Sequence, residues 1–330
     1  MIGPLHQRDS VPRWSRKGVM YTVVALFILI AISSMFMTQI RRQPHDRFVV
    51  VESRVRTMDA FLDDLGQDSA RAAYIAGFRS LIAMEQHVTT SGDYIQDPSA
   101  AFIELFVNGT YQNGSFAIMR NATFEEYLSR VRAQAQRQGI DCNLTVVQIS
   151  LWQRQPWSIM VNYTLNISIV DVGGIASWNV QRTMLGEVPI MDIRDPLYTG
   201  NTYARIQRVI KPTNITVFVD DTGNRNDSSG LRDHFNRSLY AAAGRGPDIL
   251  MRFANNNSDS IYGIESLVDI DELVAQGLPV DLGATVVDYQ YFSGVPATAC
   301  DVQTLPDRIS FVADDLEVYG VEGGLLYDPC

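Results

Sequence analysis

The longest run of hydrophobic positions lies near the start of the chain. No residue between Lys17 and Arg41 is charged, and Val, Ile, Leu, Phe and Met make up most of this segment. Its twenty-three residues reach about 34 Å as a helix, enough to cross a hydrocarbon core of about 30 Å. The run is longer than the apolar core of a cleaved secretory signal and lacks a small-x-small end. We therefore predict a cytoplasmic basic leader at residues 1–18 and a transmembrane helix at residues 19–40.

A second hydrophobic pattern follows this segment, with apolar positions three or four residues apart. These positions are Phe48, Val51, Val55, Met58, Leu62, Leu65, Ala72, Ile75, Phe78 and Ile82. The spacing is typical of one helix face and predicts an amphipathic helical stalk at residues 41–92. Pro44 is expected to kink or restart this helix, and a break is expected at Gly66. Two interpretations are open: the stalk packs on its own globular domain, or it forms a seam with other copies.

Hydrophobic and polar residues alternate between Trp157 and Ile169, with apolar or aromatic side chains at the odd positions. This period of two predicts a half-buried strand whose wet face carries Asn162 and Asn166. A turn at residues 171–174 allows residues 175–183 to return as the partner strand. We expect an antiparallel β-meander over residues 143–193.

The other predicted elements are short. Helices are expected at residues 98–107, 123–138, 231–243 and 269–276, the second opened by a capping motif at Thr123 and stopped by Gly139. Strands are expected at residues 212–219, 249–253, 285–292 and 309–312. Helices precede most strands, so the fold class is α+β, with an extracytoplasmic domain at residues 93–330 and a sub-boundary near residues 200–212.

The charge balance excludes some partners and leaves the orientation of the span open. The chain has 27 basic and 37 acidic residues, a net charge of −10, which argues against nucleic acid as the main partner. Basic residues lie on both sides of the span, and the positive-inside rule slightly favours a cytoplasmic N-terminus. Those residues are Arg8, Arg13, Arg16 and Lys17 before it, and Arg41, Arg42 and Arg47 after it.

Glycosylation sequons indicate more strongly on which side of the membrane the residues after the span lie. Ten asparagines begin an Asn-x-Ser/Thr sequon, where chance would supply roughly two, and all ten follow the span. The excess predicts N-glycan acceptors on an exported domain. They are Asn108, Asn113, Asn121, Asn143, Asn162, Asn166, Asn214, Asn226, Asn236 and Asn256.

The cysteines and histidines indicate no metal site. Cys142, Cys300 and Cys330 permit one internal disulfide at most, and we predict the Cys300–Cys330 pair because it would pin the end of the chain. None of the cysteines has a Cys-x-x-Cys spacing, and four scattered histidines are too few for a clustered site. No metal and no cofactor are expected.

No catalytic signature is present. The chain lacks a nucleophile elbow, a P-loop and an HExxH motif, and adjacent His234 and Asp233 would not face each other on a helix. Residues 220–227 resemble a calcium loop, but Arg225 and Leu231 replace the glycine and the glutamate that such a loop requires. Residues 314–317 are interpreted as an exposed acidic helix start, and residues 195–198 as a buried corner. We therefore predict that the protein is not an enzyme.

The sequence Arg16-Lys17-Gly18, placed directly before a hydrophobic helix, resembles the class III signal of archaeal type IV pilin-like proteins. The resemblance implies cleavage after Gly18, a mature N-terminus at Val19, and an apolar helix that anchors the subunit or packs into a filament core. Val23 departs from the pattern, because bacterial pilins carry Glu at that mature position. A second departure is the pair Arg41-Arg42, which places two positive charges directly after the span.

Several segments farther along resemble an archaeal family of secreted, membrane-tethered proteins without assigned activity. They are the YIAGFRSLIAMEQ helix, Gln155-Pro156-Trp157, Ile175-Ala176-Ser177-Trp178 and Asp195-Pro196-Leu197-Tyr198. We expect a single-pass, membrane-anchored cell-surface glycoprotein with a structural or interaction role, as a pilin-like or envelope component. Its partners would be the lipid bilayer and copies of itself or other envelope or pilus proteins. The alternatives are a ligand-binding or sensory ectodomain working with a membrane partner, and a surface hydrolase.

Overall fold

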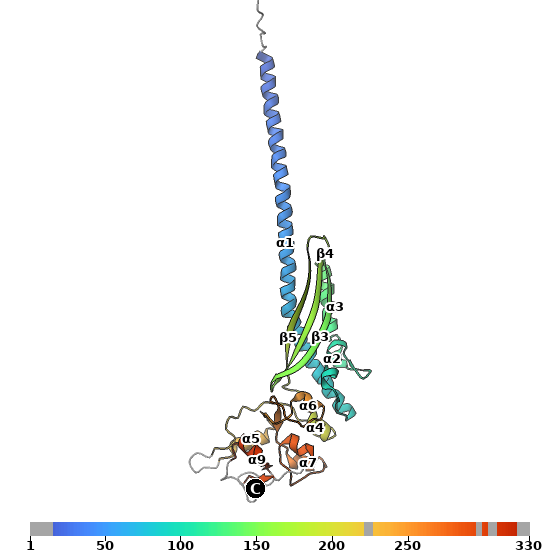
Figure 1. The fold of residues 1–330 in the computed structure, drawn as a ribbon, viewed down its shortest axis with the longest axis vertical. Helices are drawn as coiled ribbons and strands as arrows, with labels where there is room; N and C mark the ends of the chain where they lie inside the picture. Colours follow the sequence, from blue (N-terminus) through green and yellow to red (C-terminus); the bar gives the residue numbers. More distant parts are fainter. Residues whose placement is uncertain (1–15, 221–226, 295–298, 303–308, 322–330) are drawn as a thin grey trace, which may run out of the picture. The chain divides into compact units, whose positions relative to one another are not determined.

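The computed structural model describes residues 16–220, 227–294, 299–302 and 309–321 (Figure 1). The chain divides into two compact units, Met1–Phe61 and Leu62–Cys330, which are described separately. The second unit contains helices followed by antiparallel sheets. This confirms the predicted α+β class.

The first helix, α1 (Arg16–Ser91), is 76 residues long and supplies residues to both units. It continues through Pro44 and Gly66, so the predicted restart at Pro44 and the break at Gly66 are wrong. An interior proline costs about 3 kcal/mol through a lost hydrogen bond and a ring clash, and a glycine costs about 1 kcal/mol, which the many remaining hydrogen bonds of a long helix outweigh. The hydroxyl groups of Thr22 and Ser34 donate to the carbonyl oxygens of Val19 (2.8 Å) and Ala31 (3.0 Å), which satisfies them within the apolar segment.

Two capped helices follow α1. The first, α2 (Pro98–Asn108), begins where a carboxylate oxygen of Asp97 accepts from the Ala100 backbone N–H, and ends at left-handed Gly109. A hairpin of β1 (Thr110–Tyr111) and β2 (Gly114–Ser115) and a 3₁₀ turn, η1 (Ala117–Met119), lead to α3 (Phe124–Arg137). Both helices, and the stop at Gly139 with a φ of +71°, confirm the prediction.

A three-stranded antiparallel sheet, in the order β3-β4-β5, confirms the predicted meander. Its strands are β3 (Ile140–Gln155), β4 (Ser158–Asp171) and β5 (Ser177–Pro189), and α3 contacts β3 (Figure 1). Val161, Tyr163 and Leu165 of β4 are fully buried, whereas Asn162 and Asn166 point to the opposite face.

The part of α1 from Leu62 to Gly77 packs on the buried face of this sheet. Small residues permit the close approach: a Cβ on Gly186 would lie 2.7 Å from the Ala73 side chain, and one on Gly77 only 2.5 Å from that of Val188. The Tyr163 hydroxyl donates to Ser69 Oγ at 3.0 Å. This part of the predicted stalk therefore packs on its own globular domain.

The C-terminal part of the second unit consists of short elements around two apolar clusters. The elements are α4 (Pro196–Asn201), α5 (Ser229–Asn236), β6 (Tyr240–Ala242), α6 (Ile249–Phe253), β7 (Ile264–Ser266), α7 (Ile270–Ala275), α8 (Asp288–Ser293), β8 (Cys300–Asp301), β9 (Ser310–Phe311) and α9 (Ala313–Val318). The predicted helix at 269–276, the strand at 309–312 and the buried corner at 195–198 are confirmed.

Four of the short predictions here are wrong. Residues 249–253 form α6 and not a strand, because Asp248 caps the helix by accepting from the Met251 N–H at 3.0 Å. Residues 285–292 contain α8, residues 212–219 contribute only a bridge from Pro212 to Tyr240, and the helix predicted at 231–243 stops at Asn236 before β6. Apolar runs of five to eight residues carry too little periodicity to separate a buried helix turn from a strand.

Candidate functional site

The sequon asparagines are accessible throughout the described part of the chain. Eight of the nine described ones are exposed and Asn162 is half-buried, while Asn226 lies outside the described residues. A glycan requires an acceptor at the surface, because it is too bulky for a packed interior. The acceptor side chains thus meet the geometric requirement for modification.

Three of these sequons share the open face of the sheet. Asn143 on β3 lies opposite Ser168 on β4, and Asn166 on β4 lies opposite Thr145 on β3. The hydroxyl residue of each sequon is thus the cross-strand neighbour of the other sequon's asparagine. Asn162 lies on the same face. Uncharged polar side chains dominate this surface, including a Thr164–Thr183 hydroxyl pair at 2.9 Å.

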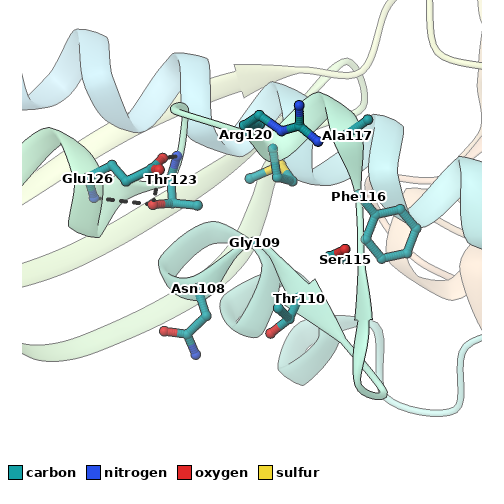
Figure 2. Close-up of a pocket in the computed structure, with 10 residues that line it drawn as sticks. Asn108, Gly109, Thr110, Ser115, Phe116, Ala117, Arg120, Thr123 and Glu126 are labelled. Carbon is teal, nitrogen blue, oxygen red and sulfur yellow. Dashed lines mark hydrogen bonds between the residues drawn. The ribbon is translucent and has the colours of Figure 1, made fainter.

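A second group of sequons surrounds a pocket between the end of α2, the hairpin and the start of α3 (Figure 2). The pocket has a volume of about 330 Å³. It is lined by Asn108 and by the hydroxyl residues of three sequons, Thr110, Ser115 and Thr123. The asparagines of these three sequons are Asn108, Asn113 and Asn121, and of these Asn108 lines the pocket.

Thr123 has two roles at this pocket. Its Oγ1 accepts from the Glu126 backbone N–H at 3.2 Å, and a Glu126 carboxylate oxygen accepts from the Thr123 N–H at 3.1 Å, which forms a capping box (Figure 2). Thr123 is also the hydroxyl residue of the Asn121 sequon. Asn121 adopts a left-handed φ of +58°, which asparagine tolerates better than most residues.

Replacing Thr123 with alanine is expected to lower the free energy of unfolding by about 0.5–2 kcal/mol, because the first turn of α3 loses its cap. The same change destroys the Asn121 sequon. Thr123→Ser keeps both the cap and the sequon, and Asn121→Gln removes the sequon alone. Urea denaturation and glycopeptide mass spectrometry of the three variants separate the two effects. Equal stability of the alanine and serine variants would contradict the capping role.

The remaining predicted site residues are placed as follows. Gly18 and Val19 lie within α1 and are exposed. Cys142 is buried and free, and burial raises the pKa of its thiol to about 11. Cys300 is buried and disulfide-bonded, whereas Cys330 lies outside the described residues, so the Cys300–Cys330 pairing stays a prediction.

The residues considered for acid–base chemistry are either buried in the core or paired with other side chains. His234 is fully buried, its ring packs edge-on against Phe218, and burial lowers its pKa to about 4. Asp233 instead pairs with Arg237 at 2.9 Å. Of the loop at residues 220–227, positions 221–226 lie outside the described residues. Asp315, predicted to be exposed, is only 2% exposed, because its face of α9 turns inward.

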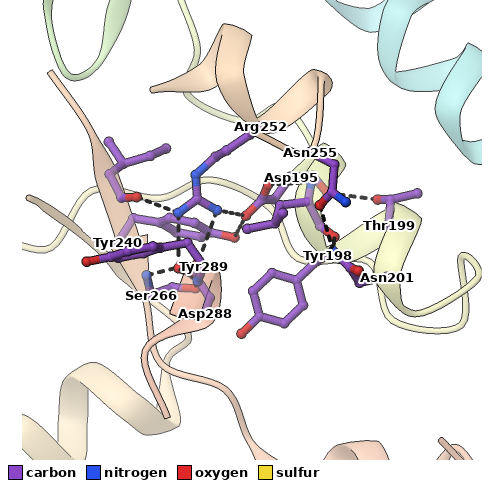
Figure 3. A network of polar contacts seen from close by, with 12 residues as sticks. Asp195, Tyr198, Thr199, Asn201, Tyr240, Arg252, Asn255, Ser266, Asp288 and Tyr289 are labelled. Carbon is purple, nitrogen blue, oxygen red and sulfur yellow. Dashed lines mark hydrogen bonds and ion pairs between the residues drawn. The ribbon is translucent and has the colours of Figure 1, made fainter. Parts of the chain in front are cut away.

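The structure contains a fully buried network of charged side chains that the sequence analysis did not predict (Figure 3). The Arg252 guanidinium contacts Asp195 Oδ2 at 2.6 Å and both oxygens of Asp288 at 3.0 and 3.1 Å. The Tyr240 hydroxyl donates to Asp195 at 2.8 Å, and Ser266 Oγ donates to Asp288 at 2.8 Å.

The network connects five elements of the C-terminal part, namely α4, β6, α6, β7 and α8. Asp195 caps α4 by accepting from the Leu197 N–H at 2.9 Å, Arg252 belongs to α6, and Asp288 opens α8. Burial raises the pKa of Asp195, while the Arg252 charge acts in the opposite direction. All three charged side chains are 0% exposed, so the cluster is closed to a substrate and its role is to hold the C-terminal elements together. Of these residues, the sequence analysis singled out only Asp195, as part of the buried corner at residues 195–198.

Two further searches, for metal-binding clusters and for similar proteins, add no functional residues. Within the described ranges, no three His, Cys, Asp or Glu side chains are arranged to hold a metal ion. No family model, no curated protein and no solved structure matches the chain.

Proposed function

We propose that this chain is a single-pass, membrane-anchored cell-surface glycoprotein with a structural or interaction role, oriented with its C-terminal domain outside. One observation carries the proposal. The segment Gly18–Met37, the one candidate span among the described residues, forms an apolar helix of which nothing is buried in the protein. It is followed by a domain in which every described sequon asparagine is accessible or half-buried.

The apolar helix needs a nonaqueous environment. Met20, Leu29 and Met37 are 73, 69 and 67% exposed, and other large side chains of the segment are similar. Leaving one such side chain in water forgoes about 1.5–3 kcal/mol relative to burying it. A core helix of a water-soluble protein would be covered by its own chain, whereas lipid supplies this cover for a span.

The interaction role rests on apolar residues beyond the span. Phe48, Val49 and Val50 are 66, 52 and 59% exposed. Phe48 begins the helical apolar pattern and Val49 and Val50 widen its apolar surface, so their contacts would be with copies of this chain or with other envelope proteins. Together with the basic leader ending at Gly18, this supports a pilin-like or envelope component over a plain anchor.

The mature N-terminus tests the pilin-like form of the proposal. We expect mass spectrometry of protein extracted from membranes to find Val19 as the first residue, because a prepilin-type peptidase would cut after Gly18. An intact Met1 would contradict the pilin-like form and support a plain anchor. A variant with Gly18→Leu provides the control, since it should retain the leader and migrate as the longer chain.

A further inference from the structure

A cavity in the Leu62–Cys330 unit brings together carboxyl groups that the anchoring proposal does not use. Its volume is about 500 Å³, and its lining includes Arg245, Glu265, Asp314 and Asp315. Glu265 lies in the middle of β7, the two aspartates lie on α9, and Arg245 lies between β6 and α6. Three segments that are separate in sequence therefore converge on one space.

Glu265 is the residue that points to a ligand. Its side chain is 1% exposed, and its Oε1 has no hydrogen-bond partner. Burial raises the pKa of the Glu265 carboxyl to about 8; the neighbouring Tyr319 hydroxyl acts in the opposite direction, and Asp315 adds to the rise. Neither Oε1 nor that hydroxyl completes a hydrogen bond of normal geometry. A buried polar atom without a well-formed hydrogen bond is costly, so its retention beside a cavity favours a donor supplied by a bound molecule.

Asp315 presents a second acceptor to the same cavity. It is 2% exposed, and its Oδ1 accepts from Gln290 Nε2 at 3.1 Å. Its Oδ2 has no partner. Burial raises the pKa of Asp315 to about 6, with the Gln290 hydrogen bond opposing the rise. The cavity therefore holds two buried carboxyl groups, each with an oxygen that lacks a donor.

The charge lining the cavity is not balanced. Arg245 is the only basic residue among the described residues that line it, and it pairs with Asp314 at 2.7 Å on the exposed rim. The side chains of that pair are 59 and 73% exposed. Arg245 also lowers the pKa of Asp315, and the buried Arg252 lowers that of Glu265, but each arginine already pairs with another carboxylate, Asp314 or Asp288. Carboxyl groups therefore outnumber basic groups around the cavity.

We propose that this cavity binds a small organic cation that carries a primary ammonium group. An ammonium has three N–H donors and no acceptor, so it matches two acceptor oxygens and adds positive charge where carboxyl groups are in excess. A neutral polyol would supply donors but no charge. A hard metal ion requires more oxygen ligands than two carboxylates, and the described residues provide no group of three metal-binding side chains. The proposal does not rest on the membrane anchor.

Binding of an ammonium requires ionised carboxylates, so it is expected to release protons. Because Glu265 titrates near pH 8 and Asp315 near pH 6, affinity should rise between pH 6 and 8 and level off above. Tyrosines and paired arginines also face these carboxyl groups. Tyr289 and Tyr319 have raised pKa values, Arg252 stays charged beside Asp288, and Arg245 stays paired with Asp314.

The test is calorimetric titration of the full chain in detergent micelles with putrescine, a four-carbon diamine. We expect saturable binding that tightens about a hundredfold from pH 6 to 8, with proton release measured in two buffers of different ionisation enthalpy. Its neutral counterpart 1,4-butanediol should give no saturable heat. Glu265→Gln should weaken putrescine binding about tenfold or more. The matched control Asp259→Asn, an exposed acid of the adjoining cavity, should change it less than about twofold.

Several results would overturn the proposal. They are no saturable putrescine binding up to about 10 mM, equal binding of the diol, unchanged affinity in Glu265→Gln, or saturable binding of calcium alone. If circular dichroism shows that the glutamine variant does not fold, the pH dependence and proton release of the wild-type chain test the proposal instead. Affinity that is flat between pH 6 and 8, or binding without proton release, would then contradict the role of Glu265.

Discussion

Replacing Arg252 with methionine is expected to lower the free energy of unfolding by about 3–5 kcal/mol. The change leaves two carboxylates, Asp195 and Asp288, buried at 0% exposure without their counter-charge. It also removes the donor to the Ile264 carbonyl oxygen on β7. Breaking one partner of a buried ion network is costly because the remaining charges stay out of water. Urea denaturation of the full chain in detergent micelles, followed by circular dichroism, measures the effect.

The matched control is Arg237→Met, which removes an arginine from an ion pair of similar length at the surface. Arg237 contacts Asp233 at 2.9 Å, and both side chains are 50% exposed. Exposed pairs contribute about 0–1 kcal/mol, so this variant should remain close to the parent chain. A variant combining Arg252→Met with Asp195→Asn and Asp288→Asn should recover part of the lost stability, because no buried charge is left unpaired. Equal losses for Arg252→Met and Arg237→Met would contradict the assignment of the network as the connection between these elements.

Placing two arginines in the apolar segment, Phe27→Arg with Ile30→Arg, is expected to abolish stable membrane insertion. An arginine near the middle of a spanning helix costs about 2.5–3.5 kcal/mol, so two cost about 5–7 kcal/mol. The segment Gly18–Met37 contains no charged residue in the parent chain, so nothing is present to pair with them. After alkaline extraction of membranes, the variant should move from the pellet to the soluble or degraded fraction.

The control for this variant is Phe27→Leu with Ile30→Leu, which keeps the segment apolar and should stay in the pellet. Retention of the arginine variant in the alkaline-washed pellet would show that the segment is not held by lipid. Loss of the leucine variant would show that specific packing, rather than hydrophobicity, holds the chain. Both variants leave the Leu62–Cys330 unit unchanged in sequence.

Long periodic patterns predicted the fold well. The alternation between Trp157 and Ile169 identified β4, and the turn glycines placed β5 beside it. The capping pattern at Thr123 located the start of α3. Along the strands many residues repeat one preference, and at Thr123 one motif satisfies the helix start, so local sequence and final structure agree.

Short segments and distant pairs were not predictable in the same way. Arg252 lies inside a mostly apolar run of five residues whose pattern predicts a strand, and its partners are 57 and 36 residues away. Nothing in a single sequence indicates which charge meets which across such separations. Asp315 shows the same limit, because adjacent Asp314 and Asp315 differ from each other in burial only through packing. The unpartnered Oε1 of Glu265 likewise becomes visible only in three dimensions.

Protease treatment of intact cells tests most directly whether a lipid-held helix carries the domain outside. The account predicts that peptides from residues 48–330 are released while the cells remain sealed, and that sequon peptides among them carry glycan mass. Residues 1–17 should be absent from the released material. Domain peptides that appear only after lysis, with unmodified asparagines, would contradict the account.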